Sequence, residues 1–492
     1  MMITTLILAS LLAAFVPFVS SRPERIVRQA IVASTIVLAL GLLAGVPPLF
    51  GSPPVAWAGL WYVDAFSGLL VVLISVVQWT ATLTSRPFLL EELREEVVSL
   101  PLVRRYYALL ALFVTAMLVT VVSDNLGFLW VALEATTLAT TFLVAFYARP
   151  SSLEAAWKYL IICSTGLALG FVGLVLVSAA ATHAGAMSAL TGLRWSALHV
   201  AAHDFSPSMM KIAFAFALVG FGTKVGLVPM HTWLPDAHSS APAPISALLS
   251  GVLLNAALFT VLRYKALTDA ALGGGAYTDG LLLAFGVLTL VVAAAFILTQ
   301  TDYKRLLAYS SAEHMGFVAL SLGLGPVGAV AAVIELIGHA LAKSMLFFGA
   351  GNILVRFRST KFSRVAGVHR VLPYTGGLFF AGILMLLAVP PSPLFMSEYL
   401  AIAAGIRAHP LAIMAALGAF VVILSGFIRL VTPFLFAPVP EGGAAHPVAR
   451  GESWNLSHTA MLLHLVLLVG FFLLVLSGTA LPFIERVTAI IS

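Results

Sequence analysis

Apolar stretches of about twenty residues follow one another along almost the whole chain, separated by short segments rich in Pro, Gly or charged residues. A helix of that length crosses the hydrocarbon core of a bilayer, so each stretch predicts one membrane-spanning helix. This pattern predicts an all-α polytopic membrane protein with about fourteen spans. The predicted spans start near Met1, Ile26, Tyr62, Tyr106, Asp124, Trp157, Met209, Ala241, Asp279, Asp302, Pro326, Pro373, Pro410 and Thr459.

The composition agrees with a chain that lies mainly in lipid. Of its 492 residues 61% are hydrophobic and only 9% are charged, and the mean hydropathy is +1.06. The net charge is +6, but the basic residues are scattered between the apolar stretches and form no patch interleaved with aromatic residues. We therefore expect a lipid bilayer around the chain and no nucleic-acid partner.

The basic residues also predict an orientation. Most of the Lys and Arg residues lie in alternate connections between predicted spans, and the densest group runs from Arg356 to Arg370. Connections rich in Lys and Arg stay in the cytoplasm, which places both termini on the outer side of the cell's inner membrane. No Lys or Arg precedes the first apolar stretch, so we interpret residues 1–20 as an uncleaved span rather than a signal peptide.

The chain contains a single cysteine, Cys163. One thiol forms no internal disulfide and cannot build a Cys-ligated iron–sulfur cluster or a Cys-rich zinc site. We therefore expect no cofactor in this chain and assign electron transfer to partner subunits. The letters GLGPVG at 323–328 match a dinucleotide-binding fingerprint, but they join two predicted helices and follow no strand, so we interpret them as a tight turn.

Two connections suggest how the chain is divided. Residues 86–105, RPFLLEELREEVVSLPLVRR, close an N-terminal three-helix segment, 1–105, and their helical spacing predicts either a helix along the membrane surface or a packed cytoplasmic helix. Residues 437–453 are rich in Pro and Gly and predict a linker. This linker separates one last spanning helix, within 437–492, from the rest of the chain.

Ionisable side chains interrupt several predicted spans: Glu134, Lys224, Glu335, Lys343 and Glu398. A charge at the centre of a membrane helix costs about 2.5–3.5 kcal/mol on insertion scales, so we expect these groups to face an internal cavity or a polar partner. Glu335, His339 and Lys343 recur every four residues and therefore share one helical face. Such a stripe is typical of a proton relay, and an i,i+4 salt bridge within a buried helix is the alternative.

Proline breaks accompany two of these charges. Pro229 and Pro235 follow Lys224, and the segment AVPPSPLFMSE at 388–398 leads to Glu398. Proline frees backbone carbonyls, which at membrane depth require protein or a water-filled cavity. One break alone is explained by a structural kink, but two in corresponding halves favour a transporter built from inverted repeats.

Several motifs resemble the antiporter-like membrane subunits of respiratory complex I: GFGTKVGLVPMHTWLPDAHSSAPAPISALLSG, LEATTLATTF, DYKRLLAYSS and HALAKSMLFF. Within that superfamily, LEATTLATTFLVAFY, AYSSAEHMGF and ALLSGVLLNAALFTVLRY are most similar to hydrogenase-4 component F, found in group 4 membrane-bound hydrogenase and formate hydrogenlyase-type complexes. The resemblance implies two inverted five-helix repeats, 106–265 and 279–436. Each repeat would contain one broken helix beside a buried polar axis.

The resemblance also implies roles for individual residues. Its motifs place Glu134, Lys224, His339, Lys343 and Glu398 on the axis that moves protons, and the stripe adds Glu335. Asn255 departs from the pattern, because many proton-pumping relatives have a lysine or histidine there. A neutral amide orders water but does not hold a proton.

The chain is therefore predicted to be a proton-translocating membrane subunit of a redox-driven complex, either a membrane-bound hydrogenase or one like NADH:quinone oxidoreductase. Na⁺ is the alternative ion. The expected partners are other membrane subunits and a peripheral redox arm. Two other functions remain open at this point, a subunit of an Mrp-type cation/proton antiporter and a non-pumping energy-coupling subunit of another complex.

Overall fold

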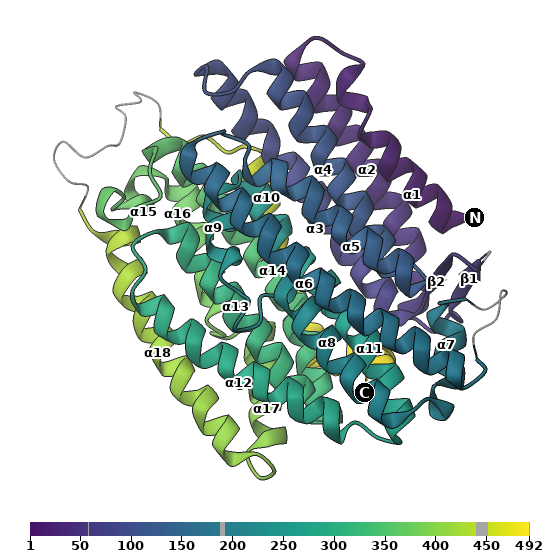
Figure 1. The fold of residues 1–492 in the computed structure, drawn as a ribbon. Coiled ribbons are helices and arrows are strands. Elements are labelled where there is room, and N and C mark those ends of the chain that lie inside the picture. Colours follow the sequence, from purple (N-terminus) through teal and green to yellow (C-terminus); the bar gives the residue numbers. More distant parts are fainter. Residues whose placement is uncertain (58, 187–191, 439–450, 492) are drawn as a thin grey trace.

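The computed structural model describes residues 1–57, 59–186, 192–438 and 451–491, and nearly all of its elements are helices that run along one common direction (Figure 1). The first part contains α1 (Met2–Ala13), a 3-10 turn (Val16–Phe18), α2 (Pro23–Leu49), α3 (Ala65–Arg94), α4 (Leu100–Val122), α5 (Leu126–Val144), α6 (Pro150–His183), α7 (Trp195–Ala201), a second 3-10 turn (Ala202–Asp204), α8 (Pro207–Val225), α9 (Trp233–Ser240), α10 (Ala243–Leu248), a π-helical segment (Leu249–Leu253) and α11 (Leu254–Leu272).

The second part contains α12 (Ala276–Leu298), α13 (Tyr303–Leu322), α14 (Pro326–Phe357), a 3-10 turn (Phe362–Arg364), α15 (Val368–Val371), α16 (Pro373–Leu386), α17 (Pro393–Gly405), α18 (Pro410–Phe436), α19 (Leu456–Leu476) and α20 (Leu481–Ile491). Within the described ranges, eleven helices are long and apolar enough to cross a bilayer, and two shorter apolar helices cover Met2–Phe18 and Pro373–Leu386. The protein is thus an all-helical, multi-pass membrane protein, as predicted.

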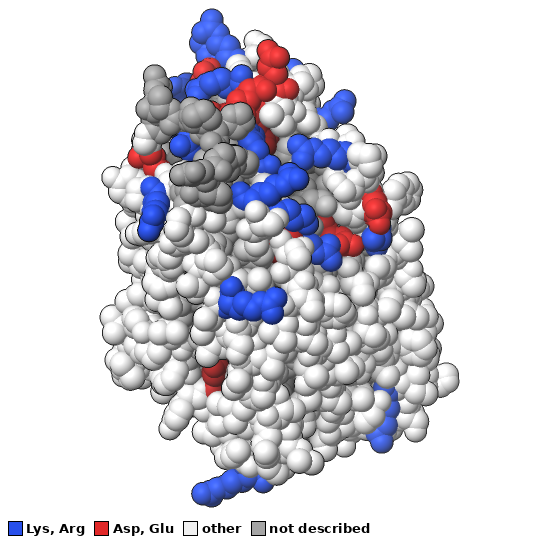
Figure 2. All heavy atoms as spheres, turned by 90° about the vertical axis from the view of Figure 1, so that its left-hand side faces the viewer, with Lys and Arg blue, Asp and Glu red and all other residues white. Residues whose placement is uncertain are grey.

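The arrangement of the helices places α14 at the centre. The N-terminal helices α1 and α2 lie at one edge of the bundle and α18 at the opposite edge (Figure 1). Every residue of α14 from 331 to 351 is buried, as are all residues of the run from α10 to the middle of α11. Most Lys and Arg side chains on the face in Figure 2 gather at one end of the molecule, which we call the basic end.

The segment 86–105 forms no helix of its own, because α3 continues through Pro87 to Arg94 and α4 begins at Leu100. Of the two predictions for this segment, the packed helix agrees with the last turns of α3. Phe88, Leu89 and Glu92 are buried against the bundle, and this packing holds the last turns of α3 in place despite the proline.

Other expectations about connections have mixed outcomes. The predicted turn at 323–328 is confirmed, since α13 ends at Leu322, α14 begins at Pro326 and Gly325 between them has a φ of +78°. Most of the linker predicted at 437–453 lies outside the described residues. The sequence pattern missed a short antiparallel hairpin, β1 (Val55–Trp57) and β2 (Trp61–Val63). It also missed the amphipathic helix α20, which packs against α3 and α14.

Helix α19 packs between α3 and α14, and one buried histidine joins all three helices. His464 contacts the backbone oxygen of Leu341 through Nδ1 at 2.9 Å and Thr80 Oγ1 through Nε2 at 3.0 Å. A carbonyl oxygen only accepts hydrogen bonds, so Nδ1 carries the proton and Nε2 accepts one from the threonine hydroxyl. His464 thereby fixes α19 to the central helix.

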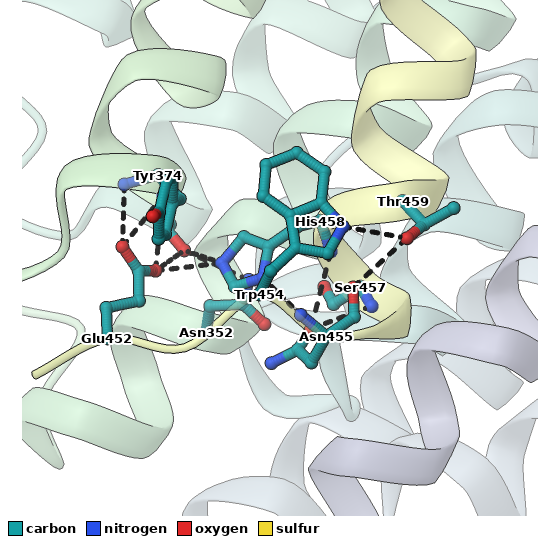
Figure 3. Close-up of polar contacts among 9 residues, drawn as sticks. Asn352, Tyr374, Glu452, Trp454, Asn455, Ser457, His458 and Thr459 are labelled. Carbon is teal, nitrogen blue, oxygen red and sulfur yellow. Dashed lines mark hydrogen bonds and ion pairs between the residues drawn. The ribbon is translucent and has the colours of Figure 1, made fainter. Parts of the chain in front are cut away.

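The segment before α19 forms a second attachment, which we call the Glu452 clasp (Figure 3). The carboxylate of Glu452 accepts hydrogen bonds from the backbone N–H groups of Tyr374 (2.7 Å) and Thr375 (3.2 Å), at the start of α16, and lies 2.8 Å from Nε2 of His458. His458 Nδ1 accepts from the N–H of Asn455 at 3.0 Å, so a neutral ring donates to Glu452 through Nε2. A carboxylate at a helix N-terminus also interacts favourably with the helix dipole.

The clasp predicts a pH-dependent stability. Burial raises the pKa of Glu452, but hydrogen bonds from His458, Thr375 and the N–H of Tyr374 outweigh it and hold this pKa below the ordinary value of 4.5. A depressed carboxyl pKa contributes stability that is complete above about pH 4.5 and is lost as the pH falls through the folded-state value. We expect Glu452→Gln to lower the thermal unfolding midpoint in detergent at pH 7. The difference from wild type should shrink towards pH 4.

The exposed carboxylate Glu485 on α20 supplies the matched control, because Glu485→Gln makes the same chemical change outside the clasp. We expect it to leave the midpoint unchanged at both pH values. An effect of Glu452→Gln that is equally large at pH 7 and pH 4 would contradict the assignment of this stability to the carboxylate charge.

An ion pair joins α3 and α11 at the end opposite the basic end. Arg263 Nη1 lies 2.7 Å from Asp64 Oδ2, and both side chains are at most 5% exposed. The guanidinium also lies 4.0 Å from the ring centre of Trp195 and 4.5 Å from that of Phe259. The other oxygen of Asp64 caps α3 by accepting from the N–H of Ser67 at 2.9 Å.

This geometry predicts a large cost when the ion pair alone is broken. Asp64→Asn keeps an oxygen for the helix cap but leaves Arg263 as an uncompensated buried charge, so we expect a loss of about 3–5 kcal/mol of stability. Adding Arg263→Met should recover much of this loss, because no buried charge then remains. Glu91→Gln, in the exposed pair with Arg94, should cost under about 1 kcal/mol. Similar unfolding midpoints for the Asp64 and Glu91 variants would disprove the assignment.

Candidate functional site

Lys224 lies in the last turn of α8, directly before the predicted break. The helix ends at Gly226, whose φ of +89° reverses the backbone, and the chain continues without regular helix until α9 begins at Trp233. The side chain of Lys224 is fully buried. Its Nζ donates to the backbone oxygen of Leu133 at 2.7 Å and to Thr137 Oγ1 at 2.5 Å, both on α5.

Thr137 connects Lys224 to Glu134. The threonine hydroxyl accepts from the lysine and lies 3.3 Å from Glu134 Oε2, towards which it donates. The other carboxylate oxygen of Glu134 accepts from Ser164 Oγ on α6 at 2.7 Å. Glu134 is only partly buried. Lys224 and Glu134 therefore communicate through a hydroxyl, and within the described residues they form no direct ion pair.

The second break separates α16 from α17 and is closed by a serine. Ser392 Oγ donates to the backbone oxygen of Met385 at 2.6 Å and accepts from the N–H of Leu394, which caps α17. Glu398 lies in the second turn of α17 and is partly buried. The neighbouring Ser397 donates to the backbone oxygen of Ala331 at 2.7 Å and so ties this turn to α14.

The stripe on α14 faces the interior of the bundle. Glu335, His339 and Lys343 are all fully buried, as the sequence predicts. Lys343 Nζ donates to the backbone oxygen of Leu307 at 2.8 Å and to Ser310 Oγ, both on α13. In the described ranges no ion pair joins two members of the stripe, so the alternative of an i,i+4 salt bridge within this helix is wrong. Glu335 and Lys343 instead contact side-chain or backbone groups of α13, and neither ring nitrogen of His339 has a hydrogen-bond partner among the described atoms.

Two functional candidates that the sequence analysis did not single out lie on α13, opposite the stripe. His314 Nδ1 lies 2.6 Å from Glu335 Oε1, and His314 Nε2 lies 3.3 Å from Glu313 Oε2. The ring centres of His314 and His339 are 5.3 Å apart. The sequence did contain a signal for these two residues. Placing two adjacent ionisable side chains inside an apolar membrane helix costs as much free energy as placing those of the stripe there.

His238 and Lys304, also not singled out, lie between the two halves of the chain. His238, on α9, is fully buried with its ring beside those of Trp233 and Phe347, and neither ring nitrogen has a hydrogen-bond partner in the described structure. Lys304 Nζ donates to the backbone oxygens of Ser239 (3.2 Å) and Ala241 (2.6 Å), which follow His238.

A cavity of about 580 Å³ lies beside Lys304. Its lining includes Lys304 and residues 239–241, together with the polar residues Arg149, Lys158, Asp236, Asp302 and Arg305. The cavity therefore reaches the segment that directly follows the buried His238. Among the described residues, no three His, Cys, Asp or Glu side chains are arranged to hold a metal ion.

Asn255 lies in the first turn of α11, directly after the π-helical segment. Its side-chain nitrogen donates to the backbone oxygen of Gly251 at 3.1 Å and lies 3.5 Å from that of Leu336 on α14. Its buried Oδ1 has no hydrogen-bond partner among the described atoms. The amide thus lies beside the stripe with a free acceptor, and a π-helical bulge at such a place is common in functional sites.

Comparison with known proteins identifies the family of this chain and relatives of its fold. Residues 123–425 match the family described as NADH:quinone oxidoreductase/Mrp antiporter, TM. The chain is 37% identical over 356 residues to the hydrogenase-4 component F homolog of Methylacidiphilum infernorum, which covers 71% of this chain and 73% of the relative.

Two solved structures share the fold. One is a chain of the membrane-bound sulfane sulfur reductase, an archaeal respiratory membrane complex, with a TM-score of 0.80 and 24% identity, covering 100% of this chain and 99% of that one. The other belongs to respiratory complex I from Thermus thermophilus, with a TM-score of 0.75 and 26% identity, covering 96% and 97%. Because the family match spans more than half of the sequence, this chain belongs to the NADH:quinone oxidoreductase/Mrp antiporter family of membrane subunits, with hydrogenase-4 component F among its relatives.

Proposed function

We propose that this chain is a proton-translocating membrane subunit of a redox-driven complex and that it moves protons along a buried axis from Lys224 to Glu398. The observation that carries the proposal is the environment of its two central lysines. Lys224 and Lys343 are fully buried, and each ammonium is hydrogen-bonded to one carbonyl and one hydroxyl oxygen of the neighbouring helix. An ammonium held only by neutral oxygens is costly in a dry interior, so release of its proton relieves that cost.

The same proposal includes the finer architecture. We assign fourteen spans, with α8 and α9 forming the broken seventh, α10 and α11 the eighth, and α16 and α17 the broken twelfth. Two inverted repeats then cover 106–265 and 279–436, between an N-terminal segment, 1–105, and a C-terminal part, 437–492. One interrupted helix in each repeat, each beside an ionisable residue, supports this division. The basic end supports an inner-membrane orientation with both termini outside.

In this mechanism the cavity beside Lys304 supplies protons from the cytoplasm. They reach Lys224 and pass from it, by way of the region of Lys304 and His238, to Lys343, then along His339 and Glu335, and leave outward at Glu398. In the first repeat, the hydroxyl of Thr137 links Lys224 to Glu134 by hydrogen bonds. A movement of Glu134 therefore changes the proton affinity of Lys224. Each charge moved against 100 mV requires about 2.3 kcal/mol, which the redox reaction of partner subunits must supply.

The names of the relatives support a redox partner, since hydrogenase-4 and complex I are electron-transfer complexes. We therefore propose other membrane subunits and a peripheral redox arm as partners. The family also includes Mrp antiporters, and a gene neighbourhood of small membrane subunits without redox proteins would favour that alternative. Asn255 is the one observation that favours a non-pumping coupling subunit, because it cannot carry a proton.

The central test replaces Lys224. In the whole complex reconstituted into vesicles, we expect Lys224→Met to leave assembly intact and to abolish proton transport, because Met fills the same space without a titratable group. Lys211→Met provides the control, since this lysine is exposed on the same helix α8. Normal proton pumping by the Lys224 variant would disprove the proposed mechanism.

A second experiment identifies the ion. The groups at Lys224, His339 and Lys343 are nitrogen bases, which bind protons, whereas Na⁺ requires several oxygen ligands. We expect turnover to change the internal pH and to drive no ²²Na uptake when a protonophore is present. Uptake of ²²Na that persists with the protonophore, without proton movement, would refute the proton assignment and favour a sodium-transporting subunit.

A further inference from the structure

His314 lies between two carboxyl groups, and this arrangement fixes a minimum number of protons. A neutral imidazole donates through one nitrogen and accepts through the other. His314 approaches Glu335 with Nδ1 at 2.6 Å and Glu313 with Nε2 at 3.3 Å. If both carboxyls were ionised and the ring neutral, one nitrogen lone pair would face a carboxylate. The three groups together therefore hold one proton in addition to the single ring proton of a neutral His314. This extra proton lies either on the ring or on one of the carboxyls.

The charges on the helices around this group favour the same proton count. Lys343 shares the buried face of α14 with Glu335, and Glu398 lies on α17, whose Ser397 donates to the backbone oxygen of Ala331 on α14. Three ionised carboxylates with one ammonium in a low-dielectric interior would leave uncompensated negative charge. One extra proton on the group of Glu335, His314 and Glu313 reduces the summed charge of the three carboxyls, His314 and a protonated Lys343 from minus two to minus one.

All three groups of this arrangement are buried. Glu335 on α14 and His314 and Glu313 on α13 are at most 4% exposed, whereas Glu398 on α17 is partly exposed. A proton that moves from Glu335 through His314 to Glu313 therefore stays inside the bundle and passes from α14 to α13. This route runs along α13 and avoids Asn255, the position on α11 that cannot carry a proton.

We propose that Glu335, His314 and Glu313 form one relay within the buried axis, and that this relay stores a transferable proton and passes it from Glu335 to Glu313. In the transfer step, the acid form of Glu335 gives its proton to Nδ1 of His314 while Nε2–H gives its proton to Glu313. The ring changes tautomer, and the total charge does not change. The relay deepens the proposed function and rests on it, because Lys343 and the stripe must deliver the proton.

The test uses the whole complex in vesicles, with proton transport and redox turnover measured together. We expect Glu313→Gln to lower transport per electron by about tenfold, because an amide hydrogen-bonds but does not take up a proton. Glu313→Asp keeps a carboxyl and should lose less. Glu452→Gln is the matched control, since Glu452 is also a largely buried carboxylate paired with a histidine, His458, but lies outside the axis. It should transport protons at the wild-type rate.

Infrared difference spectra on a pH change supply a second readout that a structural role would not alter. The C=O band of protonated carboxyl groups should lose intensity in Glu313→Gln and in Glu335→Gln and persist in Glu452→Gln. Co-purification of the subunits shows whether Glu313→Gln assembles. If it does not, His314→Gln tests the relay instead. We then expect His314→Gln to lose about as much transport, and transport at the wild-type rate would overturn the relay.

Two failures are distinguishable. Wild-type transport and an unchanged carboxyl band in Glu313→Gln, while Lys343→Met stops transport, would overturn the relay and leave the proposed function intact. Wild-type transport in Lys224→Met, or in Lys343→Met, would overturn the proposed function, and the relay with it.

Discussion

The cost of placing a charge in a membrane interior is the constraint on which this structure depends. Among the described residues, neither central lysine forms an ion pair with a carboxylate. Each ammonium donates to one backbone oxygen and one hydroxyl of a neighbouring helix, to Leu133 and Thr137 on α5 for Lys224, and to Leu307 and Ser310 on α13 for Lys343. These contacts solvate an ammonium without neutralising it. The helices that surround them must therefore stay closely packed, because water or lipid in their place would change the balance between the charged and neutral amine.

The two halves of the chain place different polar groups near their central lysines. The first half adds one carboxyl, Glu134, reached through a hydroxyl and partly exposed at the side of the bundle. The second half adds three carboxyls and two histidines around one lysine. A single carboxyl near the surface is suited to sensing a neighbouring charge, whereas a buried group with several titratable members is suited to holding protons between steps.

The sequence predicted those parts of the site that depend on the residues of a single helix. The spacing of Glu335, His339 and Lys343 determines a shared face whatever lies opposite, and the prolines after Lys224 and before Glu398 end helices by local chemistry. It could not predict that Thr137 connects Lys224 to Glu134 or that His314 faces Glu335, because these contacts depend on how separate helices are packed. The same reason explains α3, which continues past Pro87 because its last turns are buried against other helices. The short hairpin and α20 were missed because they are shorter than a membrane span.

The position of His464 has a consequence for biosynthesis. It joins α19 to Thr80, which is 384 residues earlier in the chain, and to Leu341, which is 123 residues earlier. Both partners emerge from the ribosome and enter the membrane long before α19 does. One side of the central helix therefore lacks this neighbour until α19 is inserted, and the packing of α14 around Leu341 is completed only then. A long-range contact of this kind forms late. The transport axis of a nascent chain thus stays incomplete during synthesis, when an open path for ions would discharge the membrane.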